Sequence, residues 1–411
     1  MRRLLVLVAL VAAGCSSSAN SPNAPTTADR PRTPPKPPSS STATPPPPPP
    51  PGTSVPPASS SSRTSPPIVS PAQHLFAQMS EAQRVGQLLM VDCPSTGASE
   101  ATTAAIVKYH VGSVILDGTT DSGRAAVTQV STNVENLNPS AAKLFIATDQ
   151  EGGLVQRLRG AGFSPIPSAV QQGTLDPSTL QSDARTWGRQ LHRAGVNVNL
   201  APVLDTVPAG FGSNPPIGDL DRQYGNTPGA VKSHGLAFAA GMTDAGIDVT
   251  VKHFPGIGRV RGNTDLTSGV TDSVTTRTDP YLRPFRAAVK AHVPFVMMST
   301  AIYSKIDPGV PAAFSRTIVT GILRGDLGFG GLIISDDVGA AKQVSALSPG
   351  QRAVEFVAAG GDIVLTVDAN QAAEMTSALL ARAKQDPAFK RQVDAAALLV
   401  LQTKQARGLL S

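Results

Sequence analysis

The chain has 411 residues, a formal net charge of +6 and an aromatic content of 4%. This length accommodates two average domains or one large α/β barrel with appendages. The modest charge and the scarcity of aromatic side chains argue against the basic clusters and base-stacking surfaces of a nucleic-acid-binding protein. The positive charge supports no more than weak attraction to an anionic cell envelope.

The first fifteen residues have the pattern of an export signal. Arg2 and Arg3 precede an apolar run, residues 4–13, that is too short to span a bilayer as a permanent helix. The run leads into Ala12-Ala13-Gly14-Cys15, which resembles the lipobox at which bacterial lipoproteins are cleaved and acylated, although Ala12 stands where leucine is usual. The alternative is an ordinary signal peptide with an incidental cysteine. We predict a signal peptide over residues 1–14, lipid on Cys15 and anchoring at the extracytoplasmic face of the cell membrane.

Residues 15–71 are dominated by Pro, Ser and Thr and include the uninterrupted run Pro45 to Pro51. Such a composition buries no core and favours solvated polyproline II. We therefore predict a disordered stalk over residues 15–71 and one folded domain over residues 72–411. Cys93, the other cysteine, lies in an apolar stretch and is predicted to be a small buried hydrophobe.

From about His74 onward, short apolar runs alternate with longer amphipathic ones, the pattern of βα units and a parallel sheet. Strands are expected at residues 87–91, 111–116, 144–148, 198–202, 249–253, 295–299, 331–335 and 362–366. Helices are expected between them, among them residues 177–194, 228–245, 281–291 and 349–359. Eight strands separated by helices favour a closed barrel over an open doubly wound sheet. The predicted fold is α/β, a single (β/α)8 TIM-type barrel.

Polar residues recur at the ends of these predicted strands. They are Asp149, Asp205, Lys252 with His253, Ser299, Asp336 and Asp368. All strand carboxyl ends of a barrel open on one face, so these side chains are expected to converge on one pocket. A single Asp in such a place is more often a helix cap or loop anchor, but repetition at six strand ends favours a functional site.

The segment Asp149 to Arg157 follows an apolar strand and turns on two glycines. A carboxylate accepts hydrogen bonds from two vicinal hydroxyls, and a nearby Arg fixes a further oxygen, so the segment suits a sugar clamp. The alternative is a glycine turn with incidental charges.

Lys252 and His253 end the fifth strand and lead into a glycine-rich loop that closes at Gly258. Two adjacent donors before an open loop suit a site that holds hydroxyls. A buried structural Lys is rare, which favours a functional role, whereas His253 alone would more often be a core histidine.

Ser335-Asp336-Asp337 follows a strand apolar enough to be buried on both faces. A carboxylate at that exit, on the rigid wall of a barrel, is placed to attack an anomeric carbon. For Asp337 we expect only a helix-capping role.

From about Gln78 to the C-terminus, the chain resembles glycoside hydrolase family 3, and in particular its single-domain N-acetylglucosaminidase branch. Asp149 to Arg157 resembles the family's D-Q-E-G-G-R-V-x-R segment, with Leu154 in place of the internal Arg. Gly218 to Gly225 resembles its I-G-D-R-S-F-G segment with an insertion, and Lys252 to Gly258 is the most specific match.

The resemblance implies specific roles. Asp336 would be the nucleophile of a retaining mechanism with a covalent glycosyl-enzyme, as in other retaining glycosidases. The N-acetylglucosamine ring would be held by Asp149, Arg157, Arg222, Lys252 and His253. The implied partner is a carbohydrate, and no metal or organic cofactor is implied.

One motif departs from that branch, which uses D-S-H on a mobile loop, with the His transferring the proton and the Asp orienting it. Here the stretch is Asp265-Leu266-Thr267, so the His is missing. Asp265 is the nearest surviving carboxyl, and partial desolvation would raise its pKa enough for general acid catalysis. We therefore include Asp265 with Asp336 as the predicted catalytic residues.

The leading prediction is an exo-β-N-acetylglucosaminidase acting on cell-wall fragments. Two alternatives stay open: an N-acetylglucosaminide phosphorylase, which transfers the sugar to phosphate, and a sugar-binding pseudoenzyme lipoprotein without a general acid. The sequence predicts no particular oligomeric state.

Overall fold

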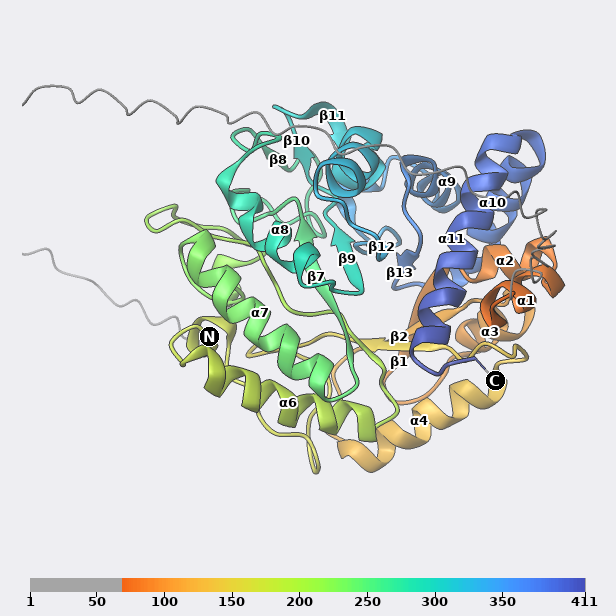
Figure 1. Ribbon diagram of the computed structural model, residues 1–411, viewed down its shortest axis with the longest axis horizontal. Helices are drawn as coiled ribbons and strands as arrows, with labels where there is room; N and C mark the ends of the chain where they lie inside the picture. Colours follow the sequence, from red (N-terminus) through yellow and green to blue (C-terminus); the bar gives the residue numbers. More distant parts are fainter. Residues whose placement is uncertain (1–68, 411) are drawn as a thin grey trace, which may run out of the picture. The chain divides into compact units, whose positions relative to one another are not determined.

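The structure is a computed structural model that describes residues 69–410 (Figure 1). Its main sheet has eight parallel strands in the order β12-β9-β7-β6-β3-β2-β1-β13. A parallel bridge between Ile334 and Ile363 joins the two end strands. The predicted TIM-type barrel is therefore confirmed. Cys15, the signal peptide and nearly all of the predicted stalk lie outside the described residues.

Each barrel strand overlaps one of the eight predicted strands. They are β1 (Leu89–Pro94), β2 (Ser113–Asp117), β3 (Phe145–Thr148), β6 (Val198–Asn199), β7 (Asp248–Phe254), β9 (Phe295–Met298), β12 (Leu332–Ser335) and β13 (Val364–Thr366). Strands that are covered on both faces are apolar almost throughout, which explains why continuous apolar runs marked them in the sequence.

Successive strand residues point to opposite faces, so each strand contributes to two packed regions. The barrel interior contains an apolar cluster that includes Met90, Ile115, Phe145, Leu200, Phe295, Met297, Ile334 and Leu365. The larger outer core includes the alternate residues Leu89, Val91, Val114, Leu116 and Ile333, which pack with helical side chains. The barrel interior is thus a packed core.

The helices are α1 (Pro71–Gln78), α2 (Glu81–Gly86), α3 (Glu100–Tyr109), α4 (Gly123–Leu137), α5 (Ala169–Gln172), α6 (Pro177–Arg193), α7 (Pro228–Asp244), α8 (Arg283–Lys290), α9 (Pro349–Ala359), α10 (Ala372–Gln385) and α11 (Pro387–Ala406). Helices α6 and α7 lie side by side on one part of the barrel wall, and α9, α10 and α11 pack together on another (Figure 1). Within residues 69–410, none of the helices has the length and apolar character needed to cross a membrane.

Local signals fix where these helices begin and end. Helix α9 starts with a capping box between Ser348 and Gln351, has Pro349 in its first turn and ends at Gly360 with φ of 106°. These are the residue types that satisfy free N–H groups at the start of a helix and permit a left-handed residue at its end. The predicted helix at 281–291 is shorter than expected, because Tyr281 belongs to a 3-10 turn, η2 (Pro280–Leu282).

Short elements that the sequence analysis did not predict extend beyond the strands. They are the hairpin β4 (Gln150–Gly152) and β5 (Val155–Gln156), the small sheet of β8 (Thr271–Asp272), β10 (Ile302–Tyr303) and β11 (Asp307–Pro311), the 3-10 turns η1 (Gly218–Leu220), η3 (Ala312–Phe314), η5 (Lys342–Val344) and η6 (Ala369–Gln371), and a π-helix, η4 (Thr317–Asp326). The hairpin, η1 and η5 are in loops that follow carboxyl ends of barrel strands.

Candidate active site

A cavity of about 380 Å³ opens at the carboxyl ends of the barrel strands. Its floor contains the interior strand residues Ile115, Leu200, Met297 and Leu365. All seven predicted site residues line it, namely Asp149, Arg157, Arg222, Lys252, His253, Asp265 and Asp336. The structure therefore brings together side chains that are separated by up to 187 positions along the chain.

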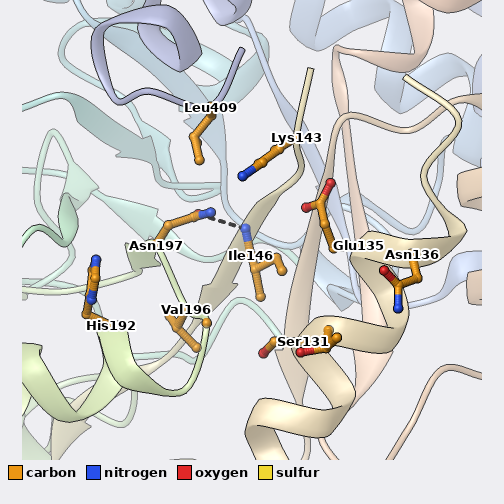
Figure 2. Close-up of a pocket in the computed structure, with 11 residues that line it drawn as sticks. Ser131, Glu135, Asn136, Lys143, Ile146, His192, Val196, Asn197 and Leu409 are labelled. Carbon is orange, nitrogen blue, oxygen red and sulfur yellow. Dashed lines mark hydrogen bonds between the residues drawn. The ribbon is translucent and has the colours of Figure 1, made fainter. Parts of the chain in front are cut away.

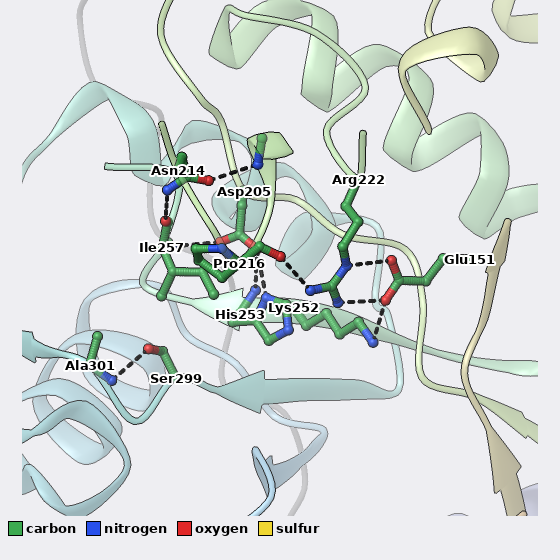
Figure 3. A network of polar contacts seen from close by, with 12 residues as sticks. Glu151, Asp205, Asn214, Pro216, Arg222, Lys252, His253, Ile257, Ser299 and Ala301 are labelled. Carbon is green, nitrogen blue, oxygen red and sulfur yellow. Dashed lines mark hydrogen bonds and ion pairs between the residues drawn. The ribbon is translucent and has the colours of Figure 1, made fainter. Parts of the chain in front are cut away.

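Four charged side chains form a network at one wall of the cavity, and Figure 3 shows three of them, Glu151, Arg222 and Lys252. Lys252 Nζ lies 2.5 Å from Asp149 Oδ1 and 2.7 Å from Glu151 Oε1. Arg222 donates from Nε and Nη2 to the two oxygens of Glu151 at 2.9 and 2.7 Å, and its Nη1 donates to the Pro216 carbonyl at 2.7 Å. Glu151 therefore holds both cations, and two negative charges balance two positive charges.

The charges of the network shift the pKa values of its own side chains. Burial opposes ionisation of Glu151, but the charges of Arg222 and Lys252 prevail and hold the pKa of Glu151 well below its usual range. Burial likewise opposes the charge on Lys252, but Asp149 and Glu151 raise the pKa of Lys252 above its ordinary value. Lys252 is thus a permanent cation and a hydrogen-bond donor, and it is unsuited to act as a base.

His253 is bound by the side chain of Asp205, which is fully buried. His253 Nδ1 donates to Asp205 Oδ2 at 2.7 Å, and the backbone N–H of Ile257 donates to Asp205 Oδ1 at 2.7 Å. A carboxylate bound to one ring nitrogen fixes the orientation of the imidazole and leaves Nε2 for another partner. The peptide bond between Lys252 and His253 is cis.

Arg157 is the remaining predicted sugar ligand. It follows β5, lines the cavity, and its Nε is buried without a hydrogen-bond partner among the described residues. Because an unpaired buried N–H is costly, this group is suited to donate to a bound oxygen atom.

Asp336 follows β12, the strand that ends at Ser335. Its N–H donates to the Met298 carbonyl at 2.9 Å, and its Oδ1 accepts from the Asp337 N–H at 2.9 Å. Burial raises the pKa of Asp336, while the positive potential of His253 and Lys252 acts in the opposite direction. One carboxylate on a rigid strand end, beside two donors, is the arrangement that a nucleophile requires.

Asp337 is a loop anchor, and the helix-capping role expected for it is wrong. Its Oδ1 accepts from the N–H groups of Gly339 and Val367, and its Oδ2 accepts from the N–H of Ala340. These bonds tie the loop after β12 to the segment after β13, because backbone N–H groups away from regular structure need other acceptors.

Asp265 lies on the loop of residues 263–267 and lines the cavity. Removal of water from its carboxyl and the negative charge of Asp336 raise the pKa of Asp265 to about 6, against the opposing effects of His253 and Arg222. Thr267 does not line the cavity, and its hydroxyl donates to the Asn263 carbonyl at 2.9 Å. Asp265 is therefore the side chain of this loop that is placed to exchange a proton at the site.

Three of the polar residues expected to converge on the cavity do not line it: Asp205, which is buried against His253, and Ser299 and Asp368. Ser299 accepts from the N–H of Ala301, and Asp368 accepts from the N–H of Asn370 within η6. These are the turn and cap roles that Ser and Asp commonly have after a strand.

The sequence analysis gave no role to three residues of the site. Glu151 lies two positions from Asp149, so a local period of two along an extended segment was the available signal. Asp205 was marked as a strand-end residue, but its contact with His253 joins two different strands. Asp117 ends β2 and also lines the cavity.

A second cavity, of about 350 Å³, lies near the amino ends of β3 and β6 (Figure 2). Ser131 and Glu135 of α4, Lys143 and Leu409 are among the residues that line it. It contains none of the predicted site residues. Among residues 69–410, no group of three or more His, Cys, Asp or Glu side chains is arranged to hold a metal ion.

A parallel barrel with side-chain donors and a carboxylate gathered at its strand ends has the arrangement of a barrel glycosidase. The model of the glycosyl hydrolase family 3 N-terminal domain matches residues 81–402. A β-hexosaminidase of Xanthomonas axonopodis pv. citri (strain 306) is 32% identical over 304 residues, which cover 72% of this chain and 88% of that protein. The chain therefore belongs to glycoside hydrolase family 3, and it is a glycoside hydrolase.

Solved structures agree with this assignment. A β-N-acetylhexosaminidase from Beutenbergia cavernae DSM 12333 is 49% identical, with a TM-score of 0.79, and the match covers 80% of this chain and 99% of that chain. A family 3 β-N-acetylglucosaminidase from Paenibacillus sp. str. FPU-7 is 30% identical, with a TM-score of 0.75, and covers 81% of this chain and 64% of that one.

Proposed function

We propose that the protein is a retaining exo-β-N-acetylglucosaminidase that forms a covalent glycosyl intermediate on Asp336. The observation that carries this proposal is that Asp336 shares one cavity with the Asp149–Lys252 ion pair, Arg222 and His253. The printed names of the relatives, β-hexosaminidase and β-N-acetylglucosaminidase, support N-acetylglucosamine as the sugar.

In the first step, an oxygen of Asp336 bonds to the anomeric carbon while the bond to the leaving-group oxygen breaks. Asp149 and the donors Arg157, Arg222 and Lys252 orient the ring through its hydroxyls. In the second step, water attacks the anomeric carbon, the bond to Asp336 breaks, and configuration is retained after two inversions.

Proton transfer is assigned to Asp265. Protonated Asp265 donates to the departing oxygen in the first step, and its carboxylate accepts a proton from water in the second. With a pKa of about 6, both forms are populated near neutral pH.

The test compares the parent protein with Asp336→Asn on an aryl N-acetylglucosaminide. We expect kcat to fall by at least about 10³-fold, since no attacking carboxylate remains. Asp368→Asn is the matched control, because Asp368 also follows a barrel strand but lies outside the cavity, and it should keep full activity. A fluorinated mechanism-based inhibitor should label the peptide that contains Asp336 in the parent protein only.

The alternatives predict different outcomes of the same experiment. The absence of the His from the D-S-H motif favours a pseudoenzyme, which would bind N-acetylglucosamine without forming an adduct. A phosphorylase would release N-acetylglucosamine 1-phosphate when phosphate is supplied. Adduct formation with free N-acetylglucosamine as the product excludes both.

We further propose that the protein is anchored through lipid on Cys15 at the extracytoplasmic face of the membrane and acts on cell-wall fragments there. The motif at residues 12–15 and the Pro-rich stalk support this location. Cys15→Ser should move the protein from the membrane fraction to the soluble fraction of the producing cells. Retention in the membrane fraction would contradict the lipid anchor.

A further inference from the structure

One wall of the active-site cavity consists of apolar side chains from three separate loops. Val155 of β5, Leu220 of η1 and Val367 after β13 all line the cavity and are half-buried. They lie beyond the strand ends, whereas the charged side chains that suit the sugar ring come from the strand ends and the loops directly after them. The wall therefore differs in chemistry from the part of the cavity that holds Asp149 and Lys252.

Two exposed apolar side chains are next in the chain to residues that line the cavity. Leu154 and Leu266 are 68% and 75% exposed, and they are chain neighbours of the lining residues Val155 and Asp265. In the described part of the chain, six large hydrophobic residues are at least 36% exposed, and Leu154 and Leu266 are the most exposed of them; the others are Val69, Val107, Val170 and Val274. A single exposed leucine has no special meaning, but two next to one cavity mouth suggest a binding surface.

The same residues mark where this chain departs from the motifs that it resembles. Leu154 stands in place of an Arg, Leu266 stands in place of the Ser of D-S-H, and Leu220 lies in the segment with the insertion. All three departures place an apolar side chain at or beside the mouth of the cavity. The residues of the sugar clamp are retained.

Several polar groups near this wall already have hydrogen-bond partners. The Asn263 side-chain oxygen accepts from the N–H of Asp265, and both Asp337 oxygens accept backbone N–H groups. Asp117 ends β2, which pairs with β3, so it lies on the same side of the barrel as Asp149. A second sugar against Val155, Leu220 and Val367 would lose water from its hydroxyls and gain few partners.

We propose that Val155, Leu220 and Val367, extended by Leu154 and Leu266, form a leaving-group subsite for an apolar aglycone, alkyl or aryl. This inference rests on the proposed function, because it takes the clamp to hold N-acetylglucosamine as the glycone. It narrows the substrate class to N-acetylglucosaminides whose leaving group presents apolar surface, and it replaces the cell-wall fragments proposed above, whose leaving group is a sugar. Such a subsite is compatible with the loss of the His, since a phenolic leaving group departs with little help from an acid.

The test uses methyl and hexyl β-N-acetylglucosaminides, whose leaving alcohols have similar acidity, so that differences in rate report binding of the chain. Each buried methylene is worth about fourfold, so we expect kcat/KM for hexyl to exceed that for methyl by roughly 10- to 100-fold. The double variant Leu154→Ser, Leu266→Ser should reduce the ratio several-fold, and adding Leu220→Ser should reduce it toward one.

Rates with the methyl glycoside should stay within about twofold of the parent in these variants, because the clamp is unchanged. Val107→Ser is the matched control, since Val107 is an exposed apolar residue on α3, outside the cavity lining. A hexyl-to-methyl ratio near one in the parent protein, or a ratio that the variants leave unchanged, would overturn the subsite.

Binding of both glycosides to Asp336→Asn, measured by calorimetry, separates this inference from the proposed function. If the parent protein hydrolyses neither glycoside while Asp336→Asn binds hexyl more tightly, the subsite stands and the hydrolase proposal fails. If both are hydrolysed equally and bound equally, the hydrolase proposal stands and the subsite fails.

Discussion

At the scale of single residues, the cavity pairs two of its buried charges, Lys252 and Glu151, so that each keeps one charge state. Lys252 contacts two carboxylates and Glu151 contacts two cations, so neither exchanges protons near neutral pH. Removing charges from water is tolerated only when each charge has a partner of this kind. The carboxyl groups to which we assign the chemistry are Asp336 and Asp265, and the negative charge of Asp336 is one cause of the raised pKa of Asp265.

The pH dependence of kcat/KM should show the separate roles of Asp265 and Asp336. Asp265 acts as an acid in its protonated form, so kcat/KM for an alkyl glycoside should fall about tenfold per pH unit above the pKa of about 6. A nitrophenyl glycoside needs little protonation and should lack this fall. Rates measured from pH 4 to 9 on both substrates test the assignment.

The variant Asp265→Asn tests the same assignment directly. This variant should lose the fall above pH 6 and hydrolyse the alkyl glycoside ~10²–10⁴-fold more slowly at pH 5. An identical fall for both substrates in the parent protein would assign the proton to another group.

At the scale of elements, the hairpin β4–β5 depends on Glu151 for its attachment to the rest of the site. Glu151 is only 4% exposed and binds Arg222, which follows η1, and Lys252, which belongs to β7. Glu151 therefore couples the hairpin to one loop and one strand that are distant in sequence. Asp205 acts similarly between the segment after β6 and the residues that end β7 and follow it.

Glu151→Gln should weaken this coupling with little change in volume. The substitution leaves Arg222 and Lys252 with an incomplete set of negative partners, which costs about 3 kcal/mol of unfolding free energy. We also expect kcat/KM to fall on the order of 10²-fold, mainly through KM, because the sugar donors lose their alignment. Denaturant unfolding and steady-state kinetics measure the two effects.

Glu355→Gln is the matched control for this substitution, since Glu355 is exposed on α9. It should change neither quantity. A Glu151→Gln protein with lower stability but unaltered KM would show that Glu151 supports the hairpin without positioning the clamp.

At the scale of the whole molecule, a buried lysine binds to the end of the barrel opposite the active site. Lys404 of α11 is fully buried and donates to Gln87 Oε1 at 2.8 Å and to the Gly112 carbonyl at 2.9 Å. Its Nζ lies 5.2 Å from the centre of the Phe145 ring. These partners precede or begin the first three barrel strands, so one helical side chain fastens α11 to the barrel.

This lysine should make stability depend on pH. Burial lowers the pKa of Lys404 to about 7, whereas the unfolded chain keeps the proton up to an ordinary pKa of 10.5. Above pH 7 the unfolded state binds more protons, so the unfolding free energy should rise by about 1.4 kcal/mol per pH unit from this residue. Between pH 7.5 and 9.0 the parent should gain about 2 kcal/mol relative to Lys404→Met.

Denaturant unfolding at both pH values measures this difference. Lys384→Met, which removes an exposed lysine of α10, should leave the pH dependence of the parent unchanged. Parallel pH dependences for the parent and Lys404→Met would mean that Lys404 stays charged in the fold.

The sequence by itself determined the barrel and the placement of three charged residues at its strand ends. Strands covered on both faces need continuous apolar runs, and residues at their carboxyl ends must meet on one face, so Asp149, Lys252 and Asp336 were found by position alone. Only the tertiary structure decided that Glu151 contacts both Arg222 and Lys252 and that Asp205 binds His253. It also decided that Ser299 and Asp368 do not line the cavity. Those outcomes depend on the distances and angles between loops, which local periodicity does not encode.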